Sequence, residues 1–137
     1  IIGAINIKTD REHGELYVLG SDWIKVFNID AHHRSSLPEQ SIKVKRELWG
    51  NNTGLFNVKD LAIGSEFIYV LDENKILKFD RADFTQDSLP LTSISVPNQL
   101  LHLDIQDDTI IATDIDGSIA RDYMGLHGFQ PREWNDY

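Results

Sequence analysis

The stretch over residues 67–80 reads Phe-Ile-Tyr-Val-Leu-Asp-Glu-Asn-Lys-Ile-Leu-Lys-Phe-Asp, and it recurs with variations before and after itself. Two runs of aromatic and β-branched residues flank a polar turn, Asp72-Glu73-Asn74, which is typical of a β-hairpin. If Tyr17, Tyr69 and Ile111 are equivalent positions, the copies lie 52 and 42 residues apart. A repeat of roughly 40 to 50 residues that holds about four strands has the length of one propeller blade.

The match between copies extends upstream of the hairpin. Leu61 and Ile63 precede Tyr69 by the same distances at which Leu103 and Ile105 precede Ile111. The sequence therefore predicts an all-β fold of about three antiparallel four-stranded blades, forming part of a β-propeller. We expect a single domain over 1–137, and its units are predicted at about 4–48, 56–96 and 99–137.

The expected strands show either alternation of apolar and polar residues or short apolar runs bounded by turn residues. They comprise the strands 4–8, 42–45, 58–63, 91–96 and 101–105 and the hairpins 16–28, 67–80 and 109–122. Connections are expected over 31–40, 49–54 and 82–90. In the central hairpin we expect the apolar side chains of Tyr69, Leu71, Ile76 and Phe79 to be buried.

Composition restricts the class of partner. The formal net charge of −9 argues against nucleic acid and against anionic membrane surfaces, because both require basic protein surface. The absence of cysteine excludes disulfides and thiolate metal sites and fits an intracellular protein, cytoplasmic or nuclear. No apolar run approaches the roughly 20 residues that span a bilayer. The start at Ile1 has no signal-peptide pattern, and we expect the chain to be part of a longer one.

Candidate metal ligands do not form a recognised pattern. Residues 114–118, Asp-Ile-Asp-Gly-Ser, begin like a calcium loop, but Gly125 stands where the closing glutamate belongs, so a hairpin turn is favoured. His32 and His33 are adjacent and would point to opposite faces of a strand. We therefore predict no catalytic residue, no metal site and no cofactor.

Two further patterns have ordinary structural explanations. Asn51-Asn52-Thr53 is a glycosylation sequon, for which we favour a turn. Lys43, Lys45 and Arg46 form a local basic stretch that could bind an acidic partner, although a solvated strand face is the default interpretation.

The repeat pattern resembles the WD-repeat and related β-propeller families. Phe27-Asn28 and Phe79-Asp80 stand where those families end a unit with Trp-Asp, whereas Asp122-Tyr123 does not, and the Gly-His pair ahead of each unit is missing. The resemblance implies a ring of four to eight blades. Three blades do not close a ring, so the others must come from a longer chain or from other chains, unless the fold is an open or sandwiched sheet.

The resemblance also implies a function. WD-like propellers serve as protein-interaction scaffolds in multiprotein assemblies, including the substrate receptors of ubiquitin ligases, so we expect protein partners and no enzymatic activity. The alternative is an enzymatic, metal-binding or sugar-binding propeller that uses His102, Asp104, Asp114 and Asp116. The predicted partner-binding residues are aromatic and lie in a turn, in a connection or in the tail: Trp23, Trp49 and Trp134. The alternative is that each packs between neighbouring blades.

Overall fold

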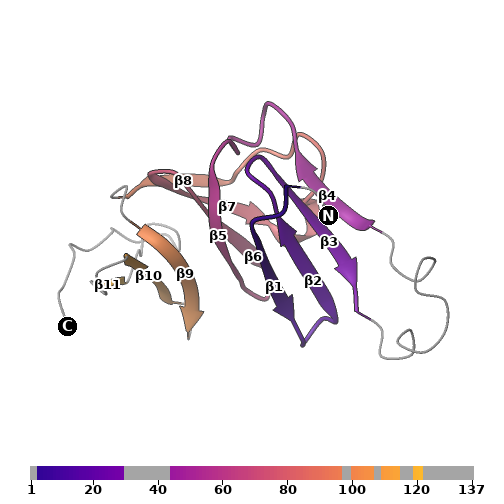
Figure 1. Ribbon diagram of the computed structural model, residues 1–137, viewed down its shortest axis with the longest axis horizontal. Helices are drawn as coiled ribbons and strands as arrows, with labels where there is room; N and C mark the ends of the chain where they lie inside the picture. The colour runs from indigo at the N-terminus through magenta and orange to yellow at the C-terminus, as the bar shows by residue number, and fades with distance from the viewer. Residues whose placement is uncertain (1–2, 30–43, 97–99, 107–108, 115–118, 122–137) are drawn as a thin grey trace.

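The computed structural model describes residues 3–29, 44–96, 100–106, 109–114 and 119–121 (Figure 1). These residues form an all-β structure of three antiparallel sheets, two of four strands and one of three. In each sheet the strands lie in the order in which they occur along the chain, as successive hairpins require. The described part contains no helix with the length and apolar character needed to cross a bilayer.

The strand bounds follow the predicted repeat. The first sheet consists of β1 (Asn6–Asp10), β2 (Glu15–Leu19), β3 (Trp23–Asn28) and β4 (Val44–Trp49). The second sheet consists of β5 (Val58–Ile63), β6 (Phe67–Asp72), β7 (Lys75–Asp80) and β8 (Thr92–Ser95). The third sheet consists of β9 (Leu100–Gln106), β10 (Thr109–Asp114) and β11 (Ile119–Arg121). The predicted limits of the three units stay a prediction, because residues 122–137 lie outside the described part.

The central hairpin forms as its sequence predicts, with one difference at the turn. Glu73 and Asn74 alone connect β6 to β7, and Glu73 adopts the positive φ of 52° that two-residue hairpin turns require. Asp72, predicted to lie in the turn, is instead the last residue of β6 and is fully buried. Its carboxylate accepts hydrogen bonds from the backbone N–H of Phe56 at 2.9 Å and of Asn57 at 3.2 Å, so it holds the segment leading into β5.

The second sheet lies between the other two, and it is covered on both faces (Figure 1). Along β6, Ile68 and Val70 pack toward the first sheet, whereas Tyr69 and Leu71 pack toward the third. Successive side chains of a strand point to opposite faces, so a strand that is covered on both sides carries apolar residues in succession, and Asp72 at the end of β6 is the exception. This explains the continuous apolar run that the repeat contains, and it confirms the predicted burial of Tyr69, Leu71, Ile76 and Phe79.

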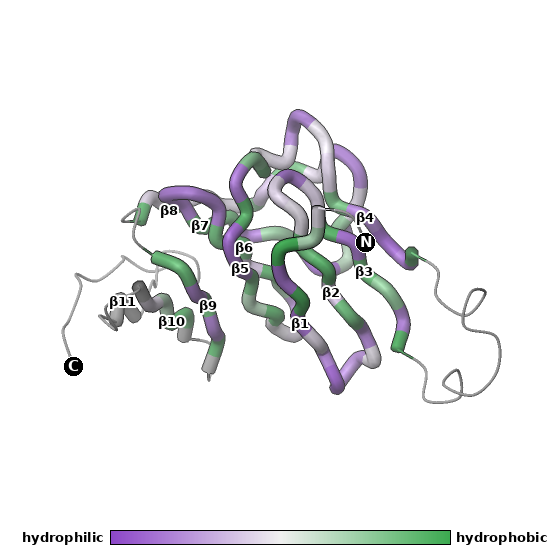
Figure 2. The backbone as a smooth tube through the Cα atoms, in the orientation of Figure 1, coloured by the Kyte–Doolittle hydropathy of each residue, from purple (hydrophilic) through white to green (hydrophobic). Residues whose placement is uncertain are grey.

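The first strands of the three sheets are neighbours, since β5 contacts both β1 and β9. The face of the first sheet that is turned toward the second sheet carries a buried cluster, Tyr17, Leu19, Ile24, Val26 and Leu48. Hydrophobic and hydrophilic segments accordingly alternate along β1 and β3 (Figure 2). The opposite face, which we call the outer face, includes the cross-strand row Ile7, Val18, Lys25 and Glu47. In this row Val18 is buried, whereas Ile7 is exposed.

Several boundaries differ from the prediction. The strand β1 lies two residues further along than the predicted 4–8. Trp49 was predicted to lie in a connection, but it is the last residue of β4. The strand extends this far because β4 stays paired with β3 as far as Trp23, the first residue of β3. The connection predicted over 82–90 begins within a short 3-10 helix, η2 (Arg81–Asp83). The backbone N–H of Ala82 in this helix donates a hydrogen bond to the carboxylate of Asp80.

Candidate functional site

The two described tryptophans of the predicted binding set are direct neighbours across strands β3 and β4. Trp23 and Trp49 are register partners at the end of the first sheet, whereas the prediction had placed Trp23 in a hairpin turn and Trp49 in a connection between units. Trp49 leaves 41% of its surface exposed, and Trp23 is half-buried. Trp134 lies outside the described residues.

The position of the Trp23 indole depends on Gly20. A Cβ atom on residue 20 would lie 2.0 Å from Cε2 of Trp23, far inside van der Waals contact. The ring can therefore lie flat against the strand end only because residue 20 has no side chain. Lys25 holds the ring as well, since its Nζ atom lies 5.1 Å from the ring centroid, within the range of a cation–π interaction.

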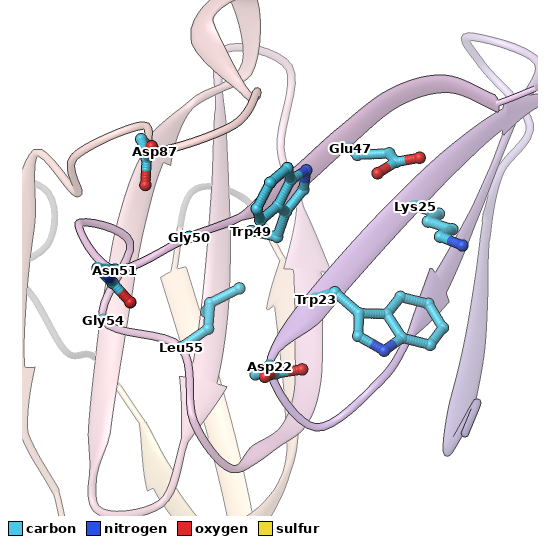
Figure 3. Close-up of a pocket in the computed structure, with 10 residues that line it drawn as sticks. All are labelled: Asp22, Trp23, Lys25, Glu47, Trp49, Gly50, Asn51, Gly54, Leu55 and Asp87. Carbon is cyan, nitrogen blue, oxygen red and sulfur yellow. The ribbon is translucent and has the colours of Figure 1, made fainter. Parts of the chain in front are cut away.

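A groove of about 650 Å³ opens beside the two tryptophans (Figure 3). We call it the tryptophan groove. Its lining residues come from the β2–β3 turn, from strands β3 and β4, from the connection to β5 and from the loop after η2. They are Asp22, Trp23, Lys25, Glu47, Trp49, Gly50, Asn51, Gly54, Leu55 and Asp87.

Backbone hydrogen bonds fix the walls of this groove. The N–H of Asp87 donates to the carbonyl of Trp49 at 2.7 Å, which ties the loop of the second sheet to the end of β4. In the connection, the hydroxyl of Thr53 donates to the carbonyl of Gly50 at 2.8 Å and accepts from the N–H of Leu55 at 3.2 Å. The turn favoured for the sequon at 51–53 is therefore present.

The charge of the groove is predominantly negative. Asp22, Glu47 and Asp87 contribute three carboxylates, whereas Lys25 is the one basic residue of the lining. Within the described part of the chain, no side chain forms a hydrogen bond or ion pair with any of these three carboxylates. The sequence pattern had not singled out these acids, because they become neighbours only when the turn, β4 and the loop meet.

Of the four residues of the alternative site, the structure describes the side chains of two. His102 and Asp104 are exposed on β9, and Nδ1 of His102 lies 3.9 Å from a carboxylate oxygen of Asp60. The side chain of Asp114 and the whole of Asp116 lie outside the described residues, as do His32 and His33. Among the residues that the structure describes, no group of three or more His, Asp or Glu side chains is arranged to hold a metal ion.

A buried ion cluster that the sequence reasoning missed joins the first two sheets. Glu15 on β2 is almost fully buried, and its carboxylate accepts hydrogen bonds from Lys45 at 2.6 Å, Arg46 at 3.1 Å and Arg81 at 2.6 Å. Tyr17 also donates its hydroxyl hydrogen to Glu15 at 2.9 Å. We call this set the Glu15 cluster.

The Glu15 cluster corrects the interpretation of the basic stretch at the start of β4 as a solvated strand face. Lys45 and Arg46 are adjacent and would point to opposite faces in a regular strand. The pairing of β3 with β4 shifts between Val26 and Phe27, so Lys45 is left without a register partner, as in a β-bulge. This irregularity lets both side chains reach Glu15. Lys43 lies outside the described residues.

The ionisation of the Glu15 cluster reflects these contacts. Burial alone would raise the pKa of Glu15, but the hydrogen bonds from Lys45, Arg46 and Tyr17 outweigh it and lower the pKa to about 2. Burial raises the pKa of the Tyr17 hydroxyl. Arg81 also pairs with Asp10, and this contact, against the effect of burial, lowers the pKa of Asp10 and raises that of Arg81.

A second buried carboxylate, Asp60 on β5, connects all three sheets. It accepts a hydrogen bond from the N–H of Leu103 on β9 at 2.8 Å and from the side-chain amide of Asn6 on β1 at 3.4 Å. Lys8 on β1 forms an ion pair with it at 3.1 Å. The sequence offered one signal for this contact, since Asp60 is an acid within a strand that is otherwise largely apolar. A charge that is buried in such a strand must be paired with a partner.

No family model matches the sequence, and neither does any curated protein. Solved propeller structures do match the fold. The β-propeller domain of Myceliophteria thermophila Cps50 (Swd1) matches with a TM-score of 0.60 at 11% identity, over 87% of this chain and 35% of that one. The Neurospora crassa Pan2 WD40 domain matches with a TM-score of 0.58 at 13% identity, over 97% of this chain and 34% of that one.

A chain of the Chaetomium thermophilum Polycomb Repressive Complex 2, in a humanized mutant form bound to the inhibitor GSK126, matches with a TM-score of 0.59 at 12% identity, over 79% of this chain and 25% of that one. The chain thus spans about a third of the first two structures and a quarter of the third. Identities this low establish the fold alone. The fold is a section of a β-propeller of the WD40 type, and it is not a sandwich or an isolated open sheet.

Proposed function

We propose that this chain is a protein-interaction scaffold, a propeller section that binds partner proteins through the tryptophan groove within a multiprotein assembly. The observation that carries the proposal is the cross-strand pair Trp23–Trp49, which borders a groove of about 650 Å³ with Trp49 41% exposed. Tryptophan is enriched among the residues that contribute most to protein–protein affinity, because it buries a large rigid surface and retains a hydrogen-bond donor.

The outer face of the first sheet supports a role within a larger assembly. Ile5 and Ile7 are 54% and 57% exposed there, whereas the second sheet has both faces covered. A propeller blade gains stability by packing each face on a neighbour. We infer that a further blade, from the same ring or from another chain, covers Ile5 and Ile7 at the β1 edge of this sheet, and that the tryptophan groove at the opposite edge, beside β4, stays accessible.

The comparisons support the assembly part of this proposal, since one of the similar chains belongs to a multiprotein complex by its description. The resemblance to WD-repeat propellers extends the proposal to the substrate-receptor subunit of a ubiquitin ligase. In that role, the propeller would hold the protein to be modified and would itself supply no catalytic group.

Truncation of Trp49 tests the proposed function. Proteins captured from a cell lysate by the wild-type chain are compared with those captured by the Trp49→Ala variant. If Trp49 anchors a partner, its loss weakens binding by about 2 kcal/mol, or about thirtyfold in Kd, and the partner is no longer retained. The Phe56→Ala variant is the control, because Phe56 is 57% exposed and does not line the groove.

The same proteins captured at the same level by all three chains would contradict the proposal. The midpoint of urea unfolding is measured for each variant beforehand. A surface truncation should leave it nearly unchanged, so that a loss of binding reports on the contact and not on the fold.

A further inference from the structure

The tryptophan groove combines an aromatic wall with an excess of negative charge. From this combination we propose that the groove binds a cationic side chain, an arginine or a lysine, that a partner protein inserts. The inference rests on the function proposed above and specifies the chemistry of the partner at that same site.

The first argument is the aromatic surface. Lys25 already places its ammonium group 5.1 Å from the centroid of the Trp23 ring, so the chain itself shows that a cation is accommodated at this wall. The neighbouring ring of Trp49 is more exposed, and no cation of the described residues lies over it. Tryptophan is the side chain that attracts a cation most strongly over its face.

The second argument is the charge. Asp22, Glu47 and Asp87 come from three separate segments and aim three carboxylates at one groove, against the single ammonium group of Lys25. An apolar side chain that filled the groove would remove water from these carboxylates without replacing its hydrogen bonds, which is unfavourable. An acidic side chain would be repelled, both locally and by the formal net charge of −9.

The third argument is size and shape. A groove of about 650 Å³ lies within the range of roughly 300–1,000 Å³ that is typical of sites for small organic groups. It has room for one long side chain and for the residues on either side of it. The aliphatic stem of an arginine or lysine can pack on Trp49 and Leu55 while the charged end reaches a carboxylate.

The test uses the indole N–H signals of the full chain labelled with ¹⁵N. The probe is a short peptide, acetylated at its N-terminus and amidated at its C-terminus, that carries one arginine between apolar residues. Its twin carries citrulline, which has nearly the same shape as arginine and no charge. We expect the arginine peptide to shift the signals of Trp23 and Trp49 saturably. The citrulline peptide should bind about two- to fivefold more weakly, because an ion pair at a partly exposed site contributes up to about this factor.

Substitution of the carboxylates tests their part in the binding. Each of three substitutions should weaken the binding of the arginine peptide by about two- to fivefold: Asp22→Asn, Glu47→Gln and Asp87→Asn. The affinity should also depend less on salt concentration than it does in the wild type. The matched control is Asp83→Asn, which makes the same change of charge at an exposed position of η2 that does not line the groove. The affinity of this control should equal that of the wild type.

Two outcomes would overturn the inference. If the citrulline peptide shifts the two signals with the same affinity, the groove binds peptides without regard to charge. The inference of a cationic partner is then refuted, whereas the proposed scaffold function is retained. If neither peptide moves the signals, the groove accepts no such side chain, and the Trp49→Ala capture experiment then decides separately whether the scaffold function holds.

Discussion

Replacement of Glu15 by glutamine removes one charge from the centre of the Glu15 cluster and keeps the shape of the side chain. Three cations remain around a neutral amide, and two of them, Arg46 and Arg81, are mostly shielded from solvent. Removing one partner from a buried ion pair costs about 3–5 kcal/mol, because the remaining charge loses its compensation. We therefore expect the Glu15→Gln variant to be less stable at pH 7.

The ionisation of Glu15 gives an independent magnitude. Its pKa falls from an ordinary 4.5 to about 2 in the folded chain. At 1.36 kcal/mol for each tenfold change in proton affinity, this difference corresponds to about 3 kcal/mol of stability at pH 7. A carboxylate whose pKa is lowered by folding stabilises the fold above pH 4.5, and the contribution fades as the pH falls toward 2. Near pH 3 about 1 kcal/mol should remain.

Urea unfolding at pH 7 and at pH 3, followed by tryptophan fluorescence, measures this difference for the wild type and for Glu15→Gln. The control is Glu12→Gln, which neutralises an exposed carboxylate in the turn between β1 and β2. The reasoning is refuted if Glu15→Gln costs less than about 1 kcal/mol at pH 7, or if its cost grows instead of shrinking toward pH 3. If Glu12→Gln lowers the free energy of unfolding as much as Glu15→Gln does, the effect comes from the change in net charge and not from the cluster.

Two further predictions concern packing. Phe79 is fully buried with the Phe84 ring perpendicular to it at 5.8 Å between centroids, so Phe79→Ala should lower the free energy of unfolding by about 3–5 kcal/mol. An unchanged urea midpoint would contradict the assignment of β7 to the core. Gly20→Ala should displace the Trp23 indole, because the added Cβ would lie 2.0 Å from Cε2. The expected cost is about 1–3 kcal/mol with an altered near-ultraviolet circular dichroism spectrum, and a spectrum identical to the wild type would refute the close contact.

The strands could be predicted from the sequence because their signals are local. Alternation of side chains and polar turn residues act over a few positions, and β5 and the central hairpin occur where these signals predict them. Burial of the central hairpin could also be predicted, since apolar residues at every position indicate a strand covered on both faces.

The charged contacts between sheets could not be predicted, since they join residues that are distant in sequence. Glu15 meets Arg81 across 66 positions, and Asp60 meets Leu103 across 43. Before the packing of the sheets is known, such acids resemble the many other acidic residues of this chain. The groove raises the same difficulty, because Asp22, Glu47 and Asp87 belong to three segments that meet only in the folded protein.

The ion pair between Glu15 and Arg81 cannot form until both residues have been synthesised. Residue 81 follows residue 15 by 66 positions, so at about 5–20 residues per second Arg81 leaves the ribosome roughly 3–13 s after its partner. During this interval Glu15 has only Lys45 and Arg46 as cations, and the apolar face of the first sheet has nothing to pack on. The nascent first sheet therefore exposes this apolar face until the second sheet has been synthesised, and the arginine that completes the Glu15 cluster belongs to the segment that covers it.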